Sequence, residues 1–162
     1  MAKFEDYKDR FKYVRFEKQD RILEMMIHRD GGSAKWEASV GGIHDELGEA
    51  FHVIGRDRDL KAVILTGAGD VFRSEMDDSG GGPDSTASKF WNRIYKEGKD
   101  LLMNLLNIEV PVIGAVNGDA FIHAELLVLS DIVIAAEGAR FADKAHAPNG
   151  VVPGDGVHVV WP

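Results

Sequence analysis

The stretch "LKAVILTGAGD", residues 60–70, indicates the fold class of this chain. Its unbroken apolar run ends in glycines and an aspartate, a pattern typical of a strand buried inside a sheet. Two later stretches have the same form, "PVIGAVNGDA" at residues 111–120 and "SDIVIAAEGARFAD" at residues 130–143. Helical stretches accompany these runs. The pattern predicts an α/β fold in which parallel strands, joined by β-α crossovers, are buried on both faces.

The helices are predicted from the spacing of apolar residues. The stretch 42–57 carries one apolar face, made of Ile43, Leu47, Ala50, Phe51 and Ile54. The longer stretch 89–110 is predicted to turn inward Trp91, Ile94, Tyr95, Leu101, Leu102 and Leu105.

The remaining segments are shorter. A short amphipathic helix is predicted over residues 4–11. Two extended runs within residues 13–32 predict a hairpin closed by Asp30 and Gly31. The Gly- and Ser-rich residues 77–88 are predicted to form a loop.

Composition limits the classes of partner. The 162 residues fit one domain with a real core, and the net charge of −8 argues against nucleic acid or an anionic membrane as the main partner. The chain has no cysteine, so it has no disulfide, no thiol nucleophile and no thiolate metal site. The charged N-terminus and the lack of an apolar run of about 18 residues give no sign of a signal peptide or membrane span. We expect a cytoplasmic protein. The apolar ending "VHVVWP" predicts a fold that continues beyond this chain.

The ends of the apolar runs indicate where a site would lie. In parallel α/β sheets, ligands bind beyond the carboxyl ends of the strands. These ends fall at residues 66–70, 117–123 and 137–143, and the last is followed by "FADKAHAPNGVVPGDG", residues 141–156. Pro and Gly fix backbone geometry, and His and Asp are common partners in proton transfer. The loop is therefore either an active-site loop or a surface turn with incidental charges.

Several motifs are absent from the sequence. It has no G-x-S-x-G elbow and no Walker loop, and "TGAGDVF" lacks the third glycine of a dinucleotide fingerprint. His146, Asp155 and His158 match no recurrent metal-ligand spacing. We expect neither a metal nor another cofactor.

Three blocks carry a family resemblance: "AVILTGAGDVF", "PVIGAVNGDAF", and "SDIVIAAEGARFAD" followed by "GVVPGDG". From about Tyr13 onward the sequence resembles the crotonase (enoyl-CoA hydratase/isomerase) superfamily. The resemblance implies a crotonase-like spiral of ββα turns, with residues 1–162 forming its core domain and the C-terminal helical region absent. It also implies trimers or pairs of trimers. Two backbone N–H groups would stabilise an enolate oxyanion, at Glu75–Met76 and at Ile122–His123.

Departures from the family pattern narrow the resemblance. CoA-using members usually carry a glycine run after "NG", where this chain has "DAFIHAEL", and F-x-A-G-x-D where it has "FRSEMD". Together with "HAPNGVVPGDG" and "HVVWP", these segments look most similar to β-diketone hydrolases of the 6-oxocamphor hydrolase type. That resemblance implies cleavage of a carbon–carbon bond in a cyclic or bicyclic β-diketone by a retro-Claisen reaction, without CoA.

On this resemblance His146 and Asp155 match a water-activating pair, and His123 and Trp36 match residues that contact a substrate carbonyl. A histidine oriented by a carboxylate is a suitable base near neutral pH. The prolines and glycines between residues 146 and 155 permit the chain reversal that such a pair needs. By themselves, His123 would be a core histidine as readily as a functional one, and Asp155 a turn residue.

Other residues stay open at this point. Glu75 could face the pocket or cap the next segment, and Glu125, near the position of a hydratase glutamate, could cap its helix or face solvent. The other histidines are interpreted as structural, two of them on the polar side of a helix: His28, His44, His52 and His158. Two alternatives remain for function. One is a CoA-thioester hydratase or hydrolase, and the other is a non-catalytic, oligomer-forming relative or inactive fragment.

Overall fold

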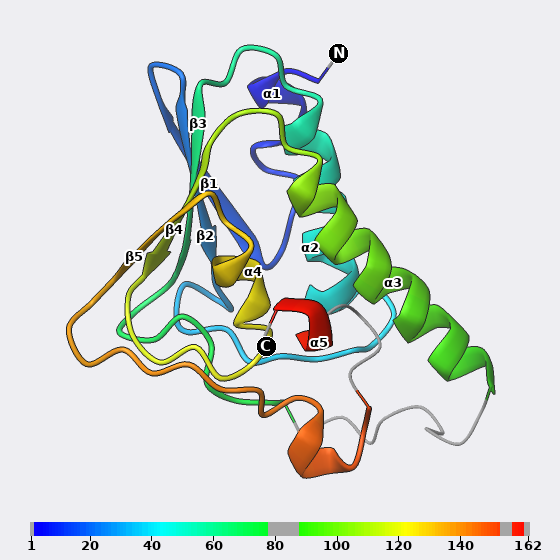
Figure 1. Cartoon of the computed structure of the whole chain (residues 1–162). Helices are drawn as coiled ribbons and strands as arrows, with labels where there is room; N and C mark the ends of the chain where they lie inside the picture. Colours follow the sequence, from blue (N-terminus) through cyan, green and yellow to red (C-terminus); the bar gives the residue numbers. More distant parts are fainter. Residues whose placement is uncertain (1, 78–87, 153–156, 161–162) are drawn as a thin grey trace.

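The computed structural model describes residues 2–77, 88–152 and 157–160. A five-stranded sheet has the order β1-β2-β3-β4-β5, with β1 antiparallel to β2 and the other neighbours parallel (Figure 1). In chain order the elements are α1 (Phe4–Tyr7), β1 (Val14–Gln19), β2 (Ile22–Ile27), α2 (Ile43–Gly55), β3 (Ala62–Gly67), α3 (Ser88–Leu106), β4 (Val112–Val116), α4 (Glu125–Val128), β5 (Ile132–Ala135), the 3-10 turn η1 (Ala147–Asn149) and α5 (Val157–Val160). The predicted α/β class and its parallel crossovers are confirmed.

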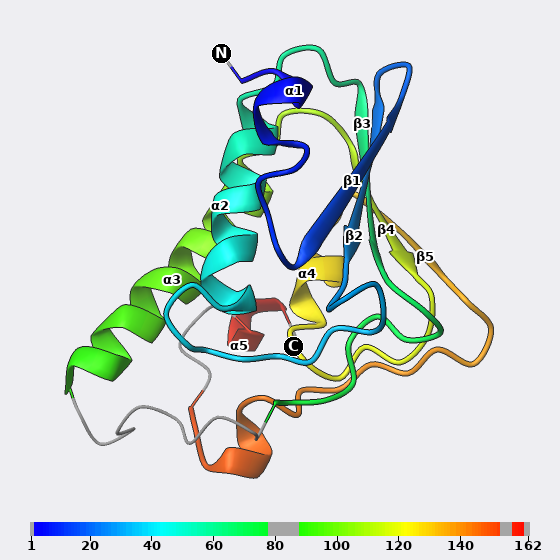
Figure 2. The same ribbon diagram turned by 180° about the vertical axis from the view of Figure 1, so that it is seen from behind.

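The crossover helices α2 and α3 pack against each other on one face of the sheet (Figures 1 and 2). Because the strand order follows the chain order, each right-handed crossover steps in the same direction and places its helix on the same side. Strands buried on both faces were therefore a wrong prediction for the described residues. Alternate residues of β3 are only half-buried, and every residue of β5 is exposed.

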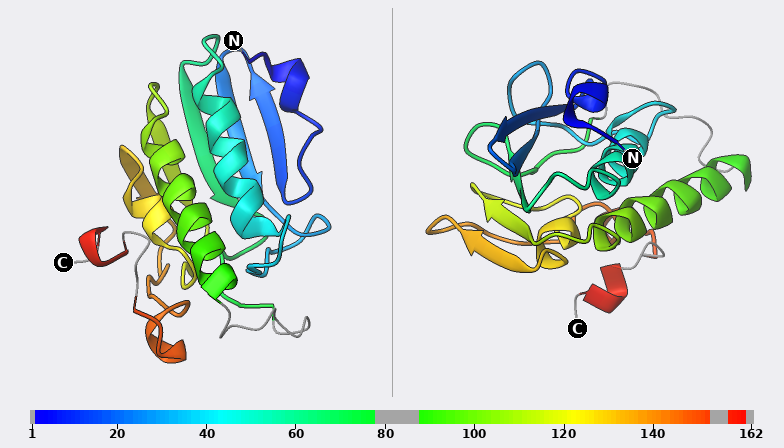
Figure 3. Two further views of the ribbon diagram at one scale, coloured as in Figure 1. Left: turned by 90° about the vertical axis from the view of Figure 1, so that its right-hand side faces the viewer. Right: turned by 90° about the horizontal axis from the view of Figure 1, so that it is seen from above.

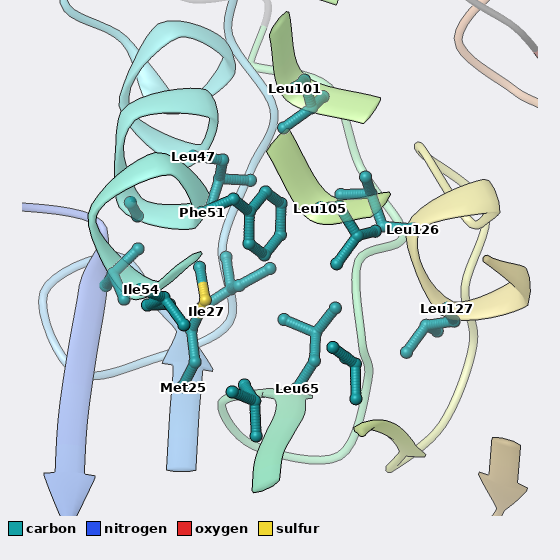
Figure 4. Close-up of a cluster of buried hydrophobic side chains, with 14 of the residues drawn as sticks. Met25, Ile27, Leu47, Phe51, Ile54, Leu65, Leu101, Leu105, Leu126 and Leu127 are labelled. Atoms are coloured by element: carbon teal, nitrogen blue, oxygen red, sulfur yellow. The ribbon is translucent and has the colours of Figure 1, made fainter. Parts of the chain in front are cut away.

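The core lies between the sheet and these helices (Figure 4). Its buried side chains come from β2, β3 and the three helices α2, α3 and α4: Met25, Ile27, Leu47, Phe51, Ile54, Leu65, Leu101, Leu105, Leu126 and Leu127. Truncating one such side chain to alanine typically costs about 2–5 kcal/mol. This packing holds the first turns of α2 and α4 in place at the carboxyl end of the sheet.

The predicted hairpin forms with a different turn. Gln19 pairs with Ile22, so the chain reverses at Asp20 and Arg21, and Asp20 has a φ of +55°. Aspartate tolerates this left-handed conformation, which explains a turn without glycine. Asp30 and Gly31 instead form a separate tight turn after β2. Closure of the hairpin by these two residues was therefore a wrong prediction.

The first half of α3 also differs from expectation. Trp91 and Tyr95 are 42% and 58% exposed, whereas Leu101, Leu102 and Leu105 are buried as predicted. The first turns of α3 project past α2, so they lie beyond the core (Figure 3). The helix ends at Leu106 rather than near residue 110.

Beyond the carboxyl ends of the strands, extended segments continue to pair. Isolated parallel bridges join Trp36 with Met76, and Ala120 with both Arg73 and Phe141. The Asn117 amide donates to the carbonyls of residues 67, 69 and 71, which ties the loop after β3 to the loop after β4. A Cβ on Gly118 would lie 1.9 Å from the Asp70 carbonyl oxygen, so only glycine allows this approach. The predicted gathering of the strand ends is confirmed.

Among the described residues, no helix combines the length and the apolar character needed to cross a bilayer.

Candidate active site

A cavity of about 360 Å³ opens at the carboxyl end of the sheet. Its walls are largely aromatic and aliphatic, with three histidines as the polar groups: Trp36, Ala38, His44, Met76, Phe90, Trp91, Ile94, Tyr95, His123, Ala145, His146, Val151 and Val152. An apolar cavity with a few convergent polar side chains is the usual form of a small-molecule site. Trp91 and Tyr95, predicted to be core, instead belong to this wall.

His146 lies on the loop that follows β5, where the turn η1 begins. Its Nδ1 is 2.9 Å from Asp143 Oδ1, and the same oxygen accepts the backbone N–H groups of Ala145 and His146. Pro148 lies within η1, and Gly150 ends it with a φ of +67°. A carboxylate on Nδ1 fixes the tautomer in which Nε2 carries the lone pair. In that tautomer Nε2 is the ring nitrogen that can accept a proton.

Asp155, the predicted partner of His146, lies outside the described residues. Its placement stays a prediction. Among the described residues, Asp143 places a carboxylate on the His146 ring. Asp143 carried no signal in the sequence except its position three residues before the histidine.

His123 and Trp36 share one wall of the cavity, and both are buried. Their ring centroids are 4.1 Å apart, and the His123 ring lies 5.6 Å from that of His146. His123 Nδ1 is 2.5 Å from Glu125 Oε1, and Glu125 is only 2% exposed. Glu125 therefore neither faces solvent nor merely caps α4; it fixes the His123 ring as Asp143 fixes that of His146.

His44 is a cavity residue that the sequence interpretation missed. It was assigned to the polar side of its helix, but its side chain is buried and its ring lies 5.6 Å from that of His123. It precedes Leu47 by three and Phe51 by seven residues, so it shares their helical face. This spacing was the signal that could have revealed it.

The His44 ring is held by residues of α3. Its Nδ1 is 3.0 Å from Glu97 Oε2, and both Glu97 oxygens accept from Arg93. Burial by itself would raise the pKa of Glu97, but the hydrogen bonds from His44 and Arg93 outweigh it and lower that pKa below its usual range. Each of the three cavity histidines is thus backed by a carboxylate on Nδ1.

The two segments predicted to supply oxyanion donors lie beside the cavity. Glu75 C=O and Asp77 N–H both face Trp36, so the Met76 N–H between them points away from Trp36. The Met76 side chain lines the cavity, whereas that of Glu75 is 62% exposed and pairs with Lys35. Ile122 is buried and donates its N–H to the Arg73 carbonyl. In the second segment, the candidate oxyanion donor is therefore the N–H of His123.

The chain matches the enoyl-CoA hydratase/isomerase family over residues 18–162, and it belongs to that family. It is 33% identical to the probable peroxisomal enoyl-CoA hydratase 1 of Arabidopsis thaliana over 69% of this chain and 40% of that protein. It is also 33% identical to the carnitinyl-CoA dehydratase of Escherichia coli K12, over 83% of this chain and 49% of the relative. The chain therefore spans about half the length of the curated relatives it matches.

Solved structures agree with this assignment. A β-diketone hydrolase from the cyanobacterium Anabaena sp. PCC 7120, bound to (S)-3-oxocyclohexyl acetic acid, has a TM-score of 0.89 and 43% identity, over 97% of this chain and 62% of that one. An enoyl-CoA hydratase/isomerase from Mycobacterium paratuberculosis has a TM-score of 0.82 and 25% identity, over 95% of this chain and 61% of that one. The resemblance to the crotonase superfamily, including its β-diketone hydrolase branch, is confirmed.

Proposed function

We propose that this chain is the catalytic core of a hydrolase that cleaves a carbon–carbon bond in a cyclic or bicyclic β-diketone. The observation that carries the proposal is the cavity itself, in which three carboxylate-backed histidines meet Trp36 among apolar walls. Such walls suit an uncharged carbocyclic substrate, and the polar groups suit two carbonyl oxygens and one water.

His146 would act as the base that takes a proton from water. The water oxygen attacks one carbonyl carbon of the diketone, and the bond from that carbon to the carbon between the two carbonyls breaks. The bonding electrons pass into the second carbonyl and form an enolate. Protonation of the enolate carbon by the imidazolium restores the base and completes a keto acid. The overall reaction converts one diketone and one water into one keto acid.

His123 and Trp36 would bind the carbonyl oxygens, the one attacked and the one that becomes the enolate. A donor aimed at an oxygen where negative charge develops lowers the barrier more than it strengthens substrate binding. The backbone N–H groups of Met76 and His123 are the further candidates for this role. No cofactor is required by this sequence of steps.

Two carboxylates are candidates for orienting His146. Asp143 contacts Nδ1, and Asp155 is the partner that the family resemblance implies. Because Nε2 must take the proton from water, the carboxylate that orients the ring acts on Nδ1, and the two acids are alternatives for that role.

The similarity to the cyanobacterial β-diketone hydrolase supports this proposal. The (S)-3-oxocyclohexyl acetic acid bound to that protein carries a ring ketone and a carboxylic acid. These are the two groups produced when water cleaves a bicyclic 1,3-diketone between its carbonyls. The 43% identity over nearly the whole of this chain makes the same substrate class the first to test.

The test is a parallel assay on bicyclo[2.2.2]octane-2,6-dione and on crotonyl-CoA, with product detection by mass spectrometry. We expect a keto acid that is heavier than the diketone by one water, and no hydration of crotonyl-CoA. Turnover of crotonyl-CoA without turnover of the diketone would favour the CoA-thioester alternative that the curated relatives represent. Inactivity on both substrates would favour a non-catalytic relative.

Assembly into a homo-oligomer, a trimer or a pair of trimers, is part of the same proposal. The support on this chain is β5, where Ile132, Val133 and Ile134 are 43–63% exposed at the edge of the sheet. Adjacent exposed apolar side chains of this kind usually mark a surface that is covered in the assembled protein.

A further inference from the structure

Arg73 is a fully buried arginine beside the cavity, and none of the proposed steps uses it. Its side chain is 0% exposed, and its guanidinium donates from Nε to the Ile122 carbonyl at 3.0 Å and from Nη2 to the His123 carbonyl at 3.2 Å. Its own carbonyl accepts the N–H groups of Phe121 and Ile122. One residue therefore fixes the whole segment that leads into His123.

These contacts determine the orientation of one peptide group. The Ile122 carbonyl and the His123 N–H belong to the same trans peptide unit, so they point in opposite directions. The His123 N–H is therefore directed away from the guanidinium. His123 has a φ of +51°, a left-handed conformation that is uncommon for residues other than glycine, although histidine adopts it more readily than most. The two carbonyls held by Arg73 flank the N–Cα bond of His123, about which φ is measured.

The same contacts polarise the peptide. A charged donor on a carbonyl draws electron density from the amide, which makes the N–H of that unit a stronger donor. The His123 N–H is thus strengthened from the opposite side of its own peptide bond.

The guanidinium also lies against Trp36, with Cζ 4.4 Å from the ring centroid. A cation over an indole face withdraws density from the ring, which strengthens the ring N–H as a donor. Arg73 Nη1 is buried without a hydrogen-bond partner among the described residues. Burial lowers the pKa of Arg73 to about 9, against the opposing field of Glu125, so the group is still charged at neutral pH.

We propose that Arg73 is a positioning residue that holds and strengthens the donors of the oxyanion site, namely the His123 N–H and the Trp36 ring N–H. It acts through these groups and contacts no reacting atom. The inference rests on the proposed function in one respect, since it takes the bound anion to be an enolate. Arg73 is a buried cation that lies behind the residues lining the cavity. Its charge favours an anionic ligand over a neutral one of the same shape.

The first experiment compares Arg73→Met, Arg73→Lys and the control Arg140→Met. Arg140 is 71% exposed and pairs with Asp119, so its loss should leave turnover unchanged. On the bicyclic diketone we expect Arg73→Met to lower kcat about 100-fold, as loss of an oxyanion donor does, with KM changed less than about threefold. Arg73→Lys should be intermediate, because it keeps the charge and loses the planar fork.

The second experiment needs no turnover. Calorimetry gives the affinities for cyclohexane-1,3-dione, which is an enolate at neutral pH, and for cyclohexanone, which is neutral. Arg73→Met should weaken binding of the enolate at least about 10-fold and leave the neutral ketone nearly unchanged. A purely structural role would weaken both ligands together, so the ratio of the two affinities is the decisive readout.

The outcomes are separable. An unchanged affinity ratio in folded Arg73→Met, or in the equally uncharged Arg73→Gln if the first variant does not fold, overturns the inference while diketone hydrolysis by the wild type stands. If neither variant folds, Arg73 serves the fold alone and the inference is equally overturned. A wild type that hydrolyses no diketone but shows an Arg73-dependent preference for the enolate rejects the proposed function and supports the role of Arg73.

Discussion

The ring of His123 lies against the ring of Trp36, with centroids 4.1 Å apart and planes tilted by 35°. The two residues come from distant parts of the chain, one from the loop after β2 and the other from the loop after β4. Both are buried and both line the cavity. The contact therefore joins two loops into a single wall that carries two polar ring edges.

Trp36→Phe tests whether that wall binds a carbonyl. The substitution keeps an aromatic face for His123 and removes the ring N–H together with part of the indole ring. We expect kcat/KM for the diketone to fall about 10- to 100-fold, as for a lost hydrogen bond that strengthens in the transition state. Steady-state kinetics beside circular dichroism would measure this. Wild-type kinetics in Trp36→Phe would mean that the tryptophan only packs.

Chelation tests the water-activating interpretation of the three histidines. Histidines backed by carboxylates also occur as metal ligands, so the contacts alone fit two chemistries. In the part of the chain that the structure describes, no group of three such side chains is placed to hold a metal ion. We expect diketone hydrolysis to survive dialysis against EDTA. Loss of activity that zinc restores would contradict the proposal.

Glu97 should make stability depend on pH. Its pKa is lowered in the folded protein despite burial, because His44 and Arg93 donate to it. The unfolded chain then binds more protons than the folded one, so the contribution is complete above the unfolded pKa of about 4.3 and is lost as pH falls through the lower folded value.

The measurement is the free energy of unfolding of wild type and Glu97→Gln between neutral and acidic pH. The difference between them should be constant near neutrality and shrink in acid. Asp45→Asn, a change at another carboxylate near the start of α2, is the matched control. A difference that does not change with pH would show that the Glu97 charge contributes nothing.

The strands and helices could be predicted from local patterns, whereas several contacts could not. Apolar runs ending at glycine mark β3 and β4, although alternate residues of both strands are only half-buried. The helices cover only one face of the sheet because of the order of the strands. That order cannot be deduced from any single stretch of sequence. The turn at Asp20 was missed because glycine at residue 31 gave a stronger but misleading signal.

The site was predictable where a motif carries the role. His123, His146 and Trp36 were identified by resemblance, and the structure brings their rings into one cavity. His44 was missed although its spacing from Leu47 was available. Arg73 could not be found from the sequence, because its role depends on carbonyls that only the tertiary structure places beside it.

The exposed apolar edge β5 predicts self-association. Ile132 and Ile134 are 52% and 63% exposed on an edge strand, a surface that tends to pair with another copy. We expect the 162-residue chain to associate at micromolar concentration and Ile132→Lys/Ile134→Lys to shift it toward monomer in sedimentation velocity. Val40→Lys, an equally polar change at an exposed loop valine, should have no effect. A monodisperse wild-type monomer would contradict the prediction.

His146 and its carboxylate are the most direct test of the chemistry. His146→Ala should lower kcat about 10²–10⁴-fold with a smaller change in KM, because the base acts in proton transfer rather than in ground-state binding. A folded His146→Ala protein that hydrolyses the diketone at near the wild-type rate would defeat the scheme.

Asp143→Asn and Asp155→Asn then identify the orienting carboxylate. In Asp143→Asn the side-chain amide oxygen can still accept the backbone N–H groups that Asp143 accepts now, so the loop keeps its shape. The negative charge beside His146 Nδ1 is lost. We expect a loss in kcat no larger than that of His146→Ala, and a double variant with His146→Ala little worse than His146→Ala alone, since residues acting as one unit are not additive. If Asp155→Asn has the larger effect and Asp143→Asn almost none, the Asp143 contact holds the loop and Asp155 supplies the charge.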